Sequence, residues 1–226
     1  MSVYVEARRE LGITGELEKQ VLLWLCARVP ARIGPDHLTL LGAAALVAGG
    51  VAYALTPRDL RWLHAVNLSL LLNWLGDSLD GTLARFRRTP RPRYGFYVDH
   101  FVDAVGATTL LGGLALSGLA HPAVAAALLV AYLLMSVEIA LCAHVTGTFR
   151  ITRGPIGGTE LRLLLIAANL AASVWPRLSV LGHTAGLFDV IAGPAAVAIA
   201  GLALASAAVT ARTLDAEDRA RLAQRG

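Results

Sequence analysis

Long apolar stretches, each close to the length that crosses a lipid bilayer, alternate with short polar segments along the whole chain. The breaks carry proline, glycine or charged residues, as at Thr56-Pro57-Arg58 and Pro176-Arg177. The pattern predicts an all-α integral membrane protein with about six transmembrane helices. They are expected at 37–55, 62–82, 95–119, 121–145, 158–178 and 187–210.

A shorter amphipathic segment precedes these stretches, from Glu16 to Arg32. Its leucines and valines are interleaved with cationic residues such as Lys19 and Arg28, which is typical of a helix that lies in the membrane interface. A short helix packed on the cytosolic face of the protein explains the pattern equally well. We therefore divide the chain into a juxtamembrane part (1–36), a six-helix membrane domain (37–210) and a charged cytosolic tail (211–226).

Composition excludes an ordinary water-soluble fold, because 56% of the residues are hydrophobic and the mean hydropathy is +0.60. The formal charge of +4 comes from arginines between apolar segments, which indicates topology and anionic headgroups and not a nucleic-acid partner. In a six-helix topology all but three of the 20 Lys and Arg residues fall on one side. The positive-inside rule then puts both termini and the loops 85–94 and 146–158 in the cytoplasm, as in a bacterial inner-membrane protein.

Two acidic helix faces stand out against this apolar background. Asp77, Asp80, Gly81, Ala84 and Arg85 share one face of the second predicted span, at its cytosolic end. The third predicted span repeats Gly95, Asp99 and Asp103 every four residues, so these also share a face. The short connection predicts that the two helices are antiparallel neighbours, and that their four carboxylates converge.

Clustered carboxylates repel one another unless they are protonated or bind cations, and hard oxygen ligands suit Mg²⁺ or Mn²⁺. The sequence therefore predicts a divalent-metal site formed by Asp77, Asp80, Asp99 and Asp103. Zinc is disfavoured because no His/Cys cluster accompanies these acids, and Cys26 and Cys142 are interpreted as apolar fillers. Small residues beside the acids leave room for a nucleotide diphosphate, whose phosphate Arg85 can bind.

The spacing Asp77-x2-Asp80-Gly81-x2-Ala84-Arg85-x9-Gly95-x3-Asp99-x3-Asp103 resembles the signature of the CDP-alcohol phosphotransferase family. The gap before Gly95 is one residue longer than the commonest form, a difference that a cytosolic loop can absorb. The segment from Gly34 to Gly42 is similar to the family's entry into its first span. With the six predicted helices, the resemblance extends over about 34–210, and its residue-level detail is confined to 77–103.

The resemblance implies transfer of a phospho-alcohol group, in most such bacterial enzymes a phosphatidyl group, from a CDP-linked donor to a hydroxyl acceptor, with release of CMP and with Mg²⁺ or Mn²⁺ as cofactor. It implies metal binding by Asp77, Asp80 and Asp99, and Asp103 as the general base. The CDP site would comprise Asp77, Asp80, Gly81, Ala84, Arg85, Gly95 and Asp99. Members are usually homodimers. A CDP-aminoalcohol donor with diacylglycerol as acceptor remains open.

Three further residues are candidates for binding the acceptor or its phosphate. Arg150 and Arg153 lie in a basic, glycine-rich loop on the predicted cytosolic side, and Glu160 follows at the membrane edge. A positive-inside loop followed by a helix cap explains the same residues without a function. Glu138, within the fourth predicted span, is either functional or a structural hydrogen-bonding group.

Two other functions satisfy part of the pattern. An intramembrane prenyltransferase of the UbiA type also uses two aspartate motifs, but those lie on well-separated helices of a longer bundle. A cation transporter could use the carboxylates as a relay, but here the acids gather at one membrane edge. The phosphotransferase explains the largest number of fixed positions.

Overall fold

The computed structural model describes residues 6–8, 15–146, 148–150, 158–180 and 183–224. Within these ranges the chain forms seven α-helices and two pairs of short strands. The helices are α1 (Gly15–Cys26), α2 (Pro35–Leu55), α3 (Trp62–Phe86), α4 (Pro92–Leu116), α5 (Pro122–Thr146), α6 (Gly158–Val174) and α7 (Leu187–Ala223). The strands are β1 (Glu6–Arg8), β2 (Thr148–Arg150), β3 (Arg177–Val180) and β4 (His183–Gly186).

Each of the six predicted spans coincides with one of the helices α2 to α7. Three of these, α2, α5 and α7, are long and apolar enough to cross a membrane. The polar residues of α3 and α4 lower their hydropathy, and α6 has 17 residues. The chain is therefore a helical membrane protein, and the crossing of all six helices stays a prediction.

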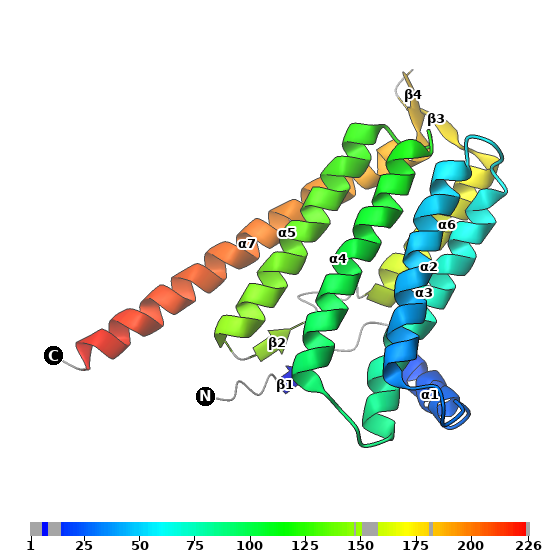
Figure 1. Ribbon diagram of the computed structural model, residues 1–226. Helices are drawn as coiled ribbons and strands as arrows, with labels where there is room; N and C mark the ends of the chain where they lie inside the picture. The colour runs from blue at the N-terminus through cyan, green and yellow to red at the C-terminus, as the bar shows by residue number, and fades with distance from the viewer. Residues whose placement is uncertain (1–5, 9–14, 147, 151–157, 181–182, 225–226) are drawn as a thin grey trace.

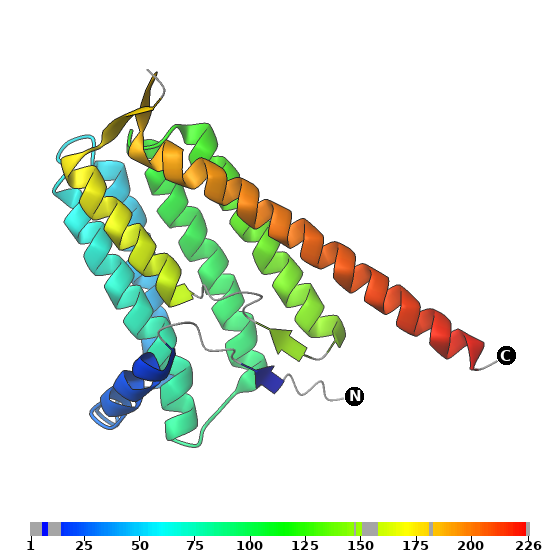
Figure 2. The ribbon, with the colours of Figure 1, turned by 180° about the vertical axis from the view of Figure 1, so that it is seen from behind.

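The helices form an up-and-down bundle (Figure 1). α2 packs against α3 and α4, α5 packs against α4 and α7, and α6 packs against α3. The antiparallel β3–β4 hairpin lies at one end of the bundle, and α1 lies at the other (Figures 1 and 2). At that second end β1 pairs in parallel with β2, and the long α7 extends away from the other helices.

Close backbone contacts through glycine hold α2 against both of its neighbours. A Cβ added to Gly113 of α4 would collide with the carbonyl group of Gly50 of α2. A Cβ added to Gly76 of α3 would lie 2.7 Å from the amide nitrogen of Gly42 of α2. Small residues at helix crossings are a common way to pack helices in membranes, where lipid is as apolar as the side chains.

Buried polar side chains join helices inside the bundle. The Tyr53 hydroxyl of α2 donates to Asn169 Oδ1 of α6 at 2.7 Å, and Asn169 Nδ2 donates to Asn67 Oδ1 of α3 at 2.7 Å. Ser206 and Thr210 of α7 both donate to Glu138 of α5. These contacts support the structural interpretation of Glu138, because each one links two helices where water is scarce.

The acidic faces of α3 and α4 converge as predicted, although the two helices are not packed directly on each other. The two helices are antiparallel, but within the described residues they make no extensive contact, and α2 packs against both. The physical reason is the chemistry of their facing surfaces. Asp77 and Asp80 on α3 oppose Asp99 and Asp103 on α4, and like charges do not form a close-packed apolar interface. A pocket lies between the two acidic faces.

The first helix has one packed face and one exposed face. Leu22 and Cys26 of α1 are buried against leucines of α2 and α3, whereas Leu17 and Trp24 are 68% and 56% exposed. Burial raises the pKa of the Cys26 thiol, although nearby arginine charges oppose that shift. Cys26 is therefore a buried neutral thiol, as an apolar filler should be. The exposed apolar face suits the interfacial position predicted for this segment.

Two further boundaries differ from the sequence prediction. The last span was predicted to end at 210, and the charged tail that follows continues the same helix, α7, without a break to Ala223. The amphipathic helix ends at Cys26, and the following loop is held by Arg87, which donates to the carbonyl oxygens of Val29, Pro30 and Ile33. Arg87 thereby fastens the end of α3 to the connection between α1 and α2.

Candidate active site

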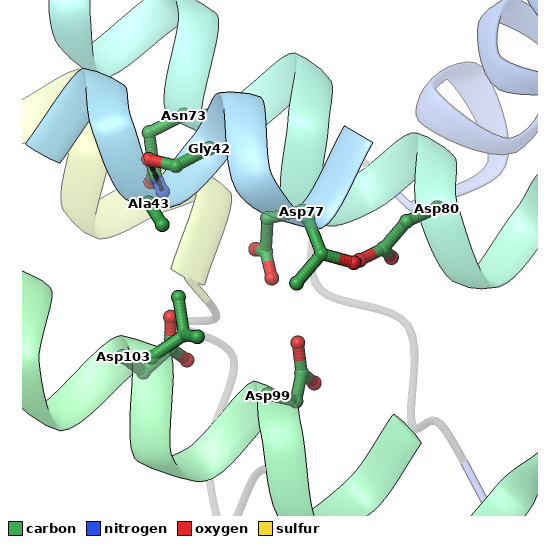
Figure 3. A pocket seen from close by; sticks show the side chains of 9 residues that line it. Gly42, Ala43, Asn73, Asp77, Asp80, Asp99 and Asp103 are labelled. Atoms are coloured by element: carbon green, nitrogen blue, oxygen red, sulfur yellow. Dashed lines mark hydrogen bonds between the residues drawn. The ribbon is translucent and has the colours of Figure 1, made fainter. Parts of the chain in front are cut away.

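Four carboxylates from two helices face one another across a single pocket (Figure 3). Asp77 and Asp80 are three residues apart on α3, and Asp99 and Asp103 are four apart on α4, so each pair lies on one helix face. α2 closes the pocket with small residues. The lining consists of Thr39, Gly42, Ala43, Asn73, Asp77, Asp80, Asp99, Val102 and Asp103.

The carboxylates on α3 are held by neighbouring helices. Asp80 accepts a hydrogen bond of 2.5 Å from the Thr39 hydroxyl of α2. Asp77 forms an ion pair of 2.7 Å with Arg162 of α6, and the two side chains are only 24% and 19% exposed. A charge-assisted hydrogen bond in such a shielded place is stronger than a surface ion pair.

Arg162 is a site residue that the sequence analysis missed. Its Nε donates to Asn73 Oδ1 at 2.7 Å, and its Nη2 donates to Asp77 Oδ2 at 2.7 Å. Asn73 in turn donates through Nδ2 to the carbonyl oxygen of Gly42, at 3.2 Å. The available signal was an arginine one turn inside a predicted membrane span, where an unpaired charge is costly and a partner should therefore be sought.

The other residues of the predicted CDP site lie beside this pocket and do not line it. Arg85 folds back along its own helix, where it donates to the Thr82 hydroxyl at 3.3 Å and lies over Gly81. Gly95 lies in the first turn of α4 and faces open space. Ala84 is partly exposed on α3.

The three candidate acceptor-binding residues differ in how much the structure describes of each. Glu160 lies in the first turn of α6, two residues before Arg162. Arg150 belongs to β2, of which only the backbone is described, and Arg153 lies outside the described residues. Glu160 is therefore close in sequence to Arg162 but does not line the pocket, and the roles of all three residues stay predictions.

The donor atoms of the pocket fit a hard divalent cation in their chemistry. All four ionisable groups lining it are carboxylates, which are the ligands that Mg²⁺ and Mn²⁺ prefer. Within the described part of the chain no three acidic, histidine or cysteine side chains already stand at metal-binding geometry. For a cation to bind, carboxylates of α3 and α4 would therefore have to draw together across the pocket.

The size of the pocket limits what it can enclose. The space inside it that the centre of a water-sized sphere can reach is about 10 Å³. A cavity needs roughly 10–15 Å³ of such space to hold one water molecule. The pocket therefore has room for about one water molecule or a bare cation, and a nucleotide would have to lie outside it, towards Gly81 and Gly95.

No protein-family model matches this chain, and no curated protein sequence matches it. The fold and the pocket define a helical membrane protein with an acidic site built on α2, α3 and α4.

Proposed function

We propose that the chain is a membrane phosphotransferase of the CDP-alcohol phosphotransferase type, which moves a phosphatidyl group from a CDP-linked lipid to a hydroxyl acceptor and releases CMP. One observation carries the proposal: Asp77, Asp80, Asp99 and Asp103 line one pocket. Their spacing, together with that of Gly81, Ala84, Arg85 and Gly95, resembles the family signature except for the one extra residue before Gly95. The seven helices of the described residues, one of which precedes the predicted spans, are compatible with this class.

The residues divide the work between binding and proton transfer. Asp77, Asp80 and Asp99 would hold Mg²⁺ or Mn²⁺, which would neutralise the charge of the donor diphosphate. Arg85, in the last turn of α3, would bind phosphate through its planar guanidinium. The small residues Gly81, Ala84 and Gly95 would leave space for the nucleotide. Positioning of this kind supplies most of the catalysis in phosphoryl transfer.

Asp103 would take the proton of the acceptor hydroxyl. The acceptor oxygen then forms a bond to the lipid-bearing phosphorus, the P–O bond to CMP breaks, and CMP leaves with the electron pair. The proton stays on Asp103 until it passes to solvent or to the leaving phosphate. Asp103 and Asp99 are one turn apart on α4, which would put the base beside the diphosphate.

The charge distribution and the composition predict the topology of the chain and the membrane that contains it. Both termini and the acidic pocket would face the cytoplasm, where CDP-linked donors are made, and the membrane would be a bacterial inner membrane. CDP-diacylglycerol is the favoured donor, and a CDP-aminoalcohol donor with diacylglycerol as acceptor is the alternative. A homodimer is the assembly that the family resemblance implies.

The direct test is CMP release by the purified full chain in lipid nanodiscs. CDP-diacylglycerol would be offered with glycerol phosphate, inositol, inositol phosphate or serine, and a CDP-aminoalcohol would be offered with diacylglycerol. We expect CMP to appear with CDP-diacylglycerol and one of the soluble acceptors. Diphosphate release from a prenyl diphosphate, without CMP from any donor, would instead establish the prenyltransferase.

Activity should depend on a divalent cation. Excess EDTA is expected to lower CMP release more than about 100-fold, because the carboxylates would then face the donor diphosphate without a neutralising charge. Adding Mg²⁺ or Mn²⁺ beyond the EDTA concentration should restore the rate, which controls for denaturation by the chelator. Undiminished turnover in excess EDTA would contradict the metal assignment.

A further inference from the structure

A carboxylate outside the pocket joins three elements of the fold. Glu18 of α1 accepts hydrogen bonds from Trp74 Nε1 at 3.1 Å and from the Ser78 hydroxyl at 3.0 Å, both on α3. The Thr159 hydroxyl at the start of α6 lies 3.2 Å from each Glu18 oxygen. One acidic side chain on the first helix thus fastens the first turn of α6 to the middle of α3.

The residues that Glu18 binds lie next to those that hold Arg162. Asn73 and Asp77 accept from Arg162, and the residues that follow each of them, Trp74 and Ser78, donate to Glu18. Glu18 and Arg162 therefore hold the same turn of α3 from two neighbouring faces.

The register of α6 links the two contacts. Thr159 precedes Arg162 by three residues, so both side chains lie on the same side of the helix. A shift or rotation of the first turn of α6 would move both of them relative to α3. The contact between Thr159 and Glu18 therefore restrains the guanidinium that pairs with Asp77.

We infer that Glu18 is a positioning residue that holds Arg162 on Asp77, where Arg162 serves as an internal counter-ion that competes with a divalent cation for the pocket. The inference rests on the proposed function only in that a divalent cation binds these carboxylates. Arg162 keeps Asp77 neutralised while the pocket is empty of metal. Cation binding then requires the ion pair to loosen.

The direction in which Glu18→Gln changes the Mn²⁺ affinity distinguishes this positioning role from a purely electrostatic one. Removing an acidic charge near a cation site ordinarily weakens cation binding, because the local potential becomes less negative. Glu18→Gln is expected to do the opposite. By loosening the first turn of α6 it weakens the hold of Arg162 on Asp77, and a competitor of the cation is lost.

The experiment measures Mn²⁺ affinity by electron paramagnetic resonance on the full chain in nanodiscs, without substrate. Arg162→Gln should tighten Mn²⁺ binding about tenfold, the worth of one charge-assisted hydrogen bond. Glu18→Gln and Thr159→Val should each tighten it about threefold, since they loosen the pair without removing it. In the Arg162→Gln background, Glu18→Gln should cause no further change in Mn²⁺ affinity, because Glu18 acts through Arg162.

Two matched variants act as controls. Glu16→Gln removes the same charge from an exposed position two residues away on α1, and should leave Mn²⁺ affinity unchanged or slightly weaker. Thr159→Ser keeps the hydroxyl and should behave as the unaltered chain. Thr159→Val also carries the test if Glu18→Gln does not fold, because it leaves the contacts of Glu18 with α3 in place.

Weaker Mn²⁺ binding by Glu18→Gln and Thr159→Val, or full additivity with Arg162→Gln, would overturn the inference. If CMP release fails while the Mn²⁺ pattern appears as expected, the proposed function is wrong and the inference stands. If CMP is released but the variants act additively, only the inference is wrong. Absence of Mn²⁺ binding in both the unaltered chain and Arg162→Gln would overturn the inference and the metal assignment together.

Discussion

Asp103→Asn is expected to lower the rate of CMP release about 10²- to 10⁴-fold, the usual contribution of a general base. The substitution keeps the size and shape of the side chain but removes its ability to accept a proton at neutral pH. Asp103 lines the pocket on α4, opposite Asp77, so the loss should fall on turnover and not on folding. The measurement is initial-rate CMP release at saturating donor and acceptor, with thermal unfolding recorded in parallel.

Two comparisons separate a base from a metal ligand. Mn²⁺ affinity should stay within a few-fold for Asp103→Asn, whereas Asp80→Asn should weaken it about tenfold or more, as loss of a charged ligand does. Asp215→Asn, at an exposed position near the end of α7, should leave both quantities unchanged. Near-normal turnover by Asp103→Asn would remove Asp103 from the role of base.

Gly113→Val is expected to be the most destabilising single substitution in the bundle. A Cβ at this position would collide with the backbone of Gly50, and a backbone atom cannot move aside as a side chain can. Overpacking of this kind costs roughly 3 kcal/mol or more, which corresponds to a fall of about 10 °C in Tm for a chain of this size. Thermal unfolding of the purified protein in detergent would measure it.

The neighbouring glycine supplies the control. A Cβ at Gly112 would meet no atom within 4 Å, so Gly112→Val adds the same β-branched side chain to the same helix without the collision. Its Tm should change by only a few degrees, because no neighbouring atom has to move and valine is no poorer a helix former than glycine. Equal losses for both variants would mean that the contact between α2 and α4 does not limit stability.

The helices could be predicted because their signal is local. Apolar runs bounded by Pro35, Pro92 and Pro122 are readable one segment at a time, and each of these prolines begins a helix in the structure. The carboxylate faces were readable for the same reason. Spacings of three and four residues put Asp77 with Asp80, and Asp99 with Asp103, whatever the rest of the chain does.

The parts that could not be predicted depend on contacts between distant segments. The position of α2 between α3 and α4 depends on backbone contacts at Gly42, Gly50 and their partners, and a glycine in an apolar run does not indicate which helix approaches it. Arg162 and Glu18 reach the same turn of α3 from α6 and α1. The sequence around each of these two residues does not indicate that it contacts this turn of α3.

The length of α7 has a consequence for the space outside the membrane. A helix of 37 residues is about 55 Å long, whereas the hydrocarbon core of a bilayer is about 30 Å thick. Its last turns carry ion pairs between Arg219 and Asp215 and between Arg221 and Glu217. Such pairs stiffen a helix in water. The end of α7 would therefore extend into water beyond the hydrocarbon core, and a domain fused after Ala223 would be held away from the membrane surface.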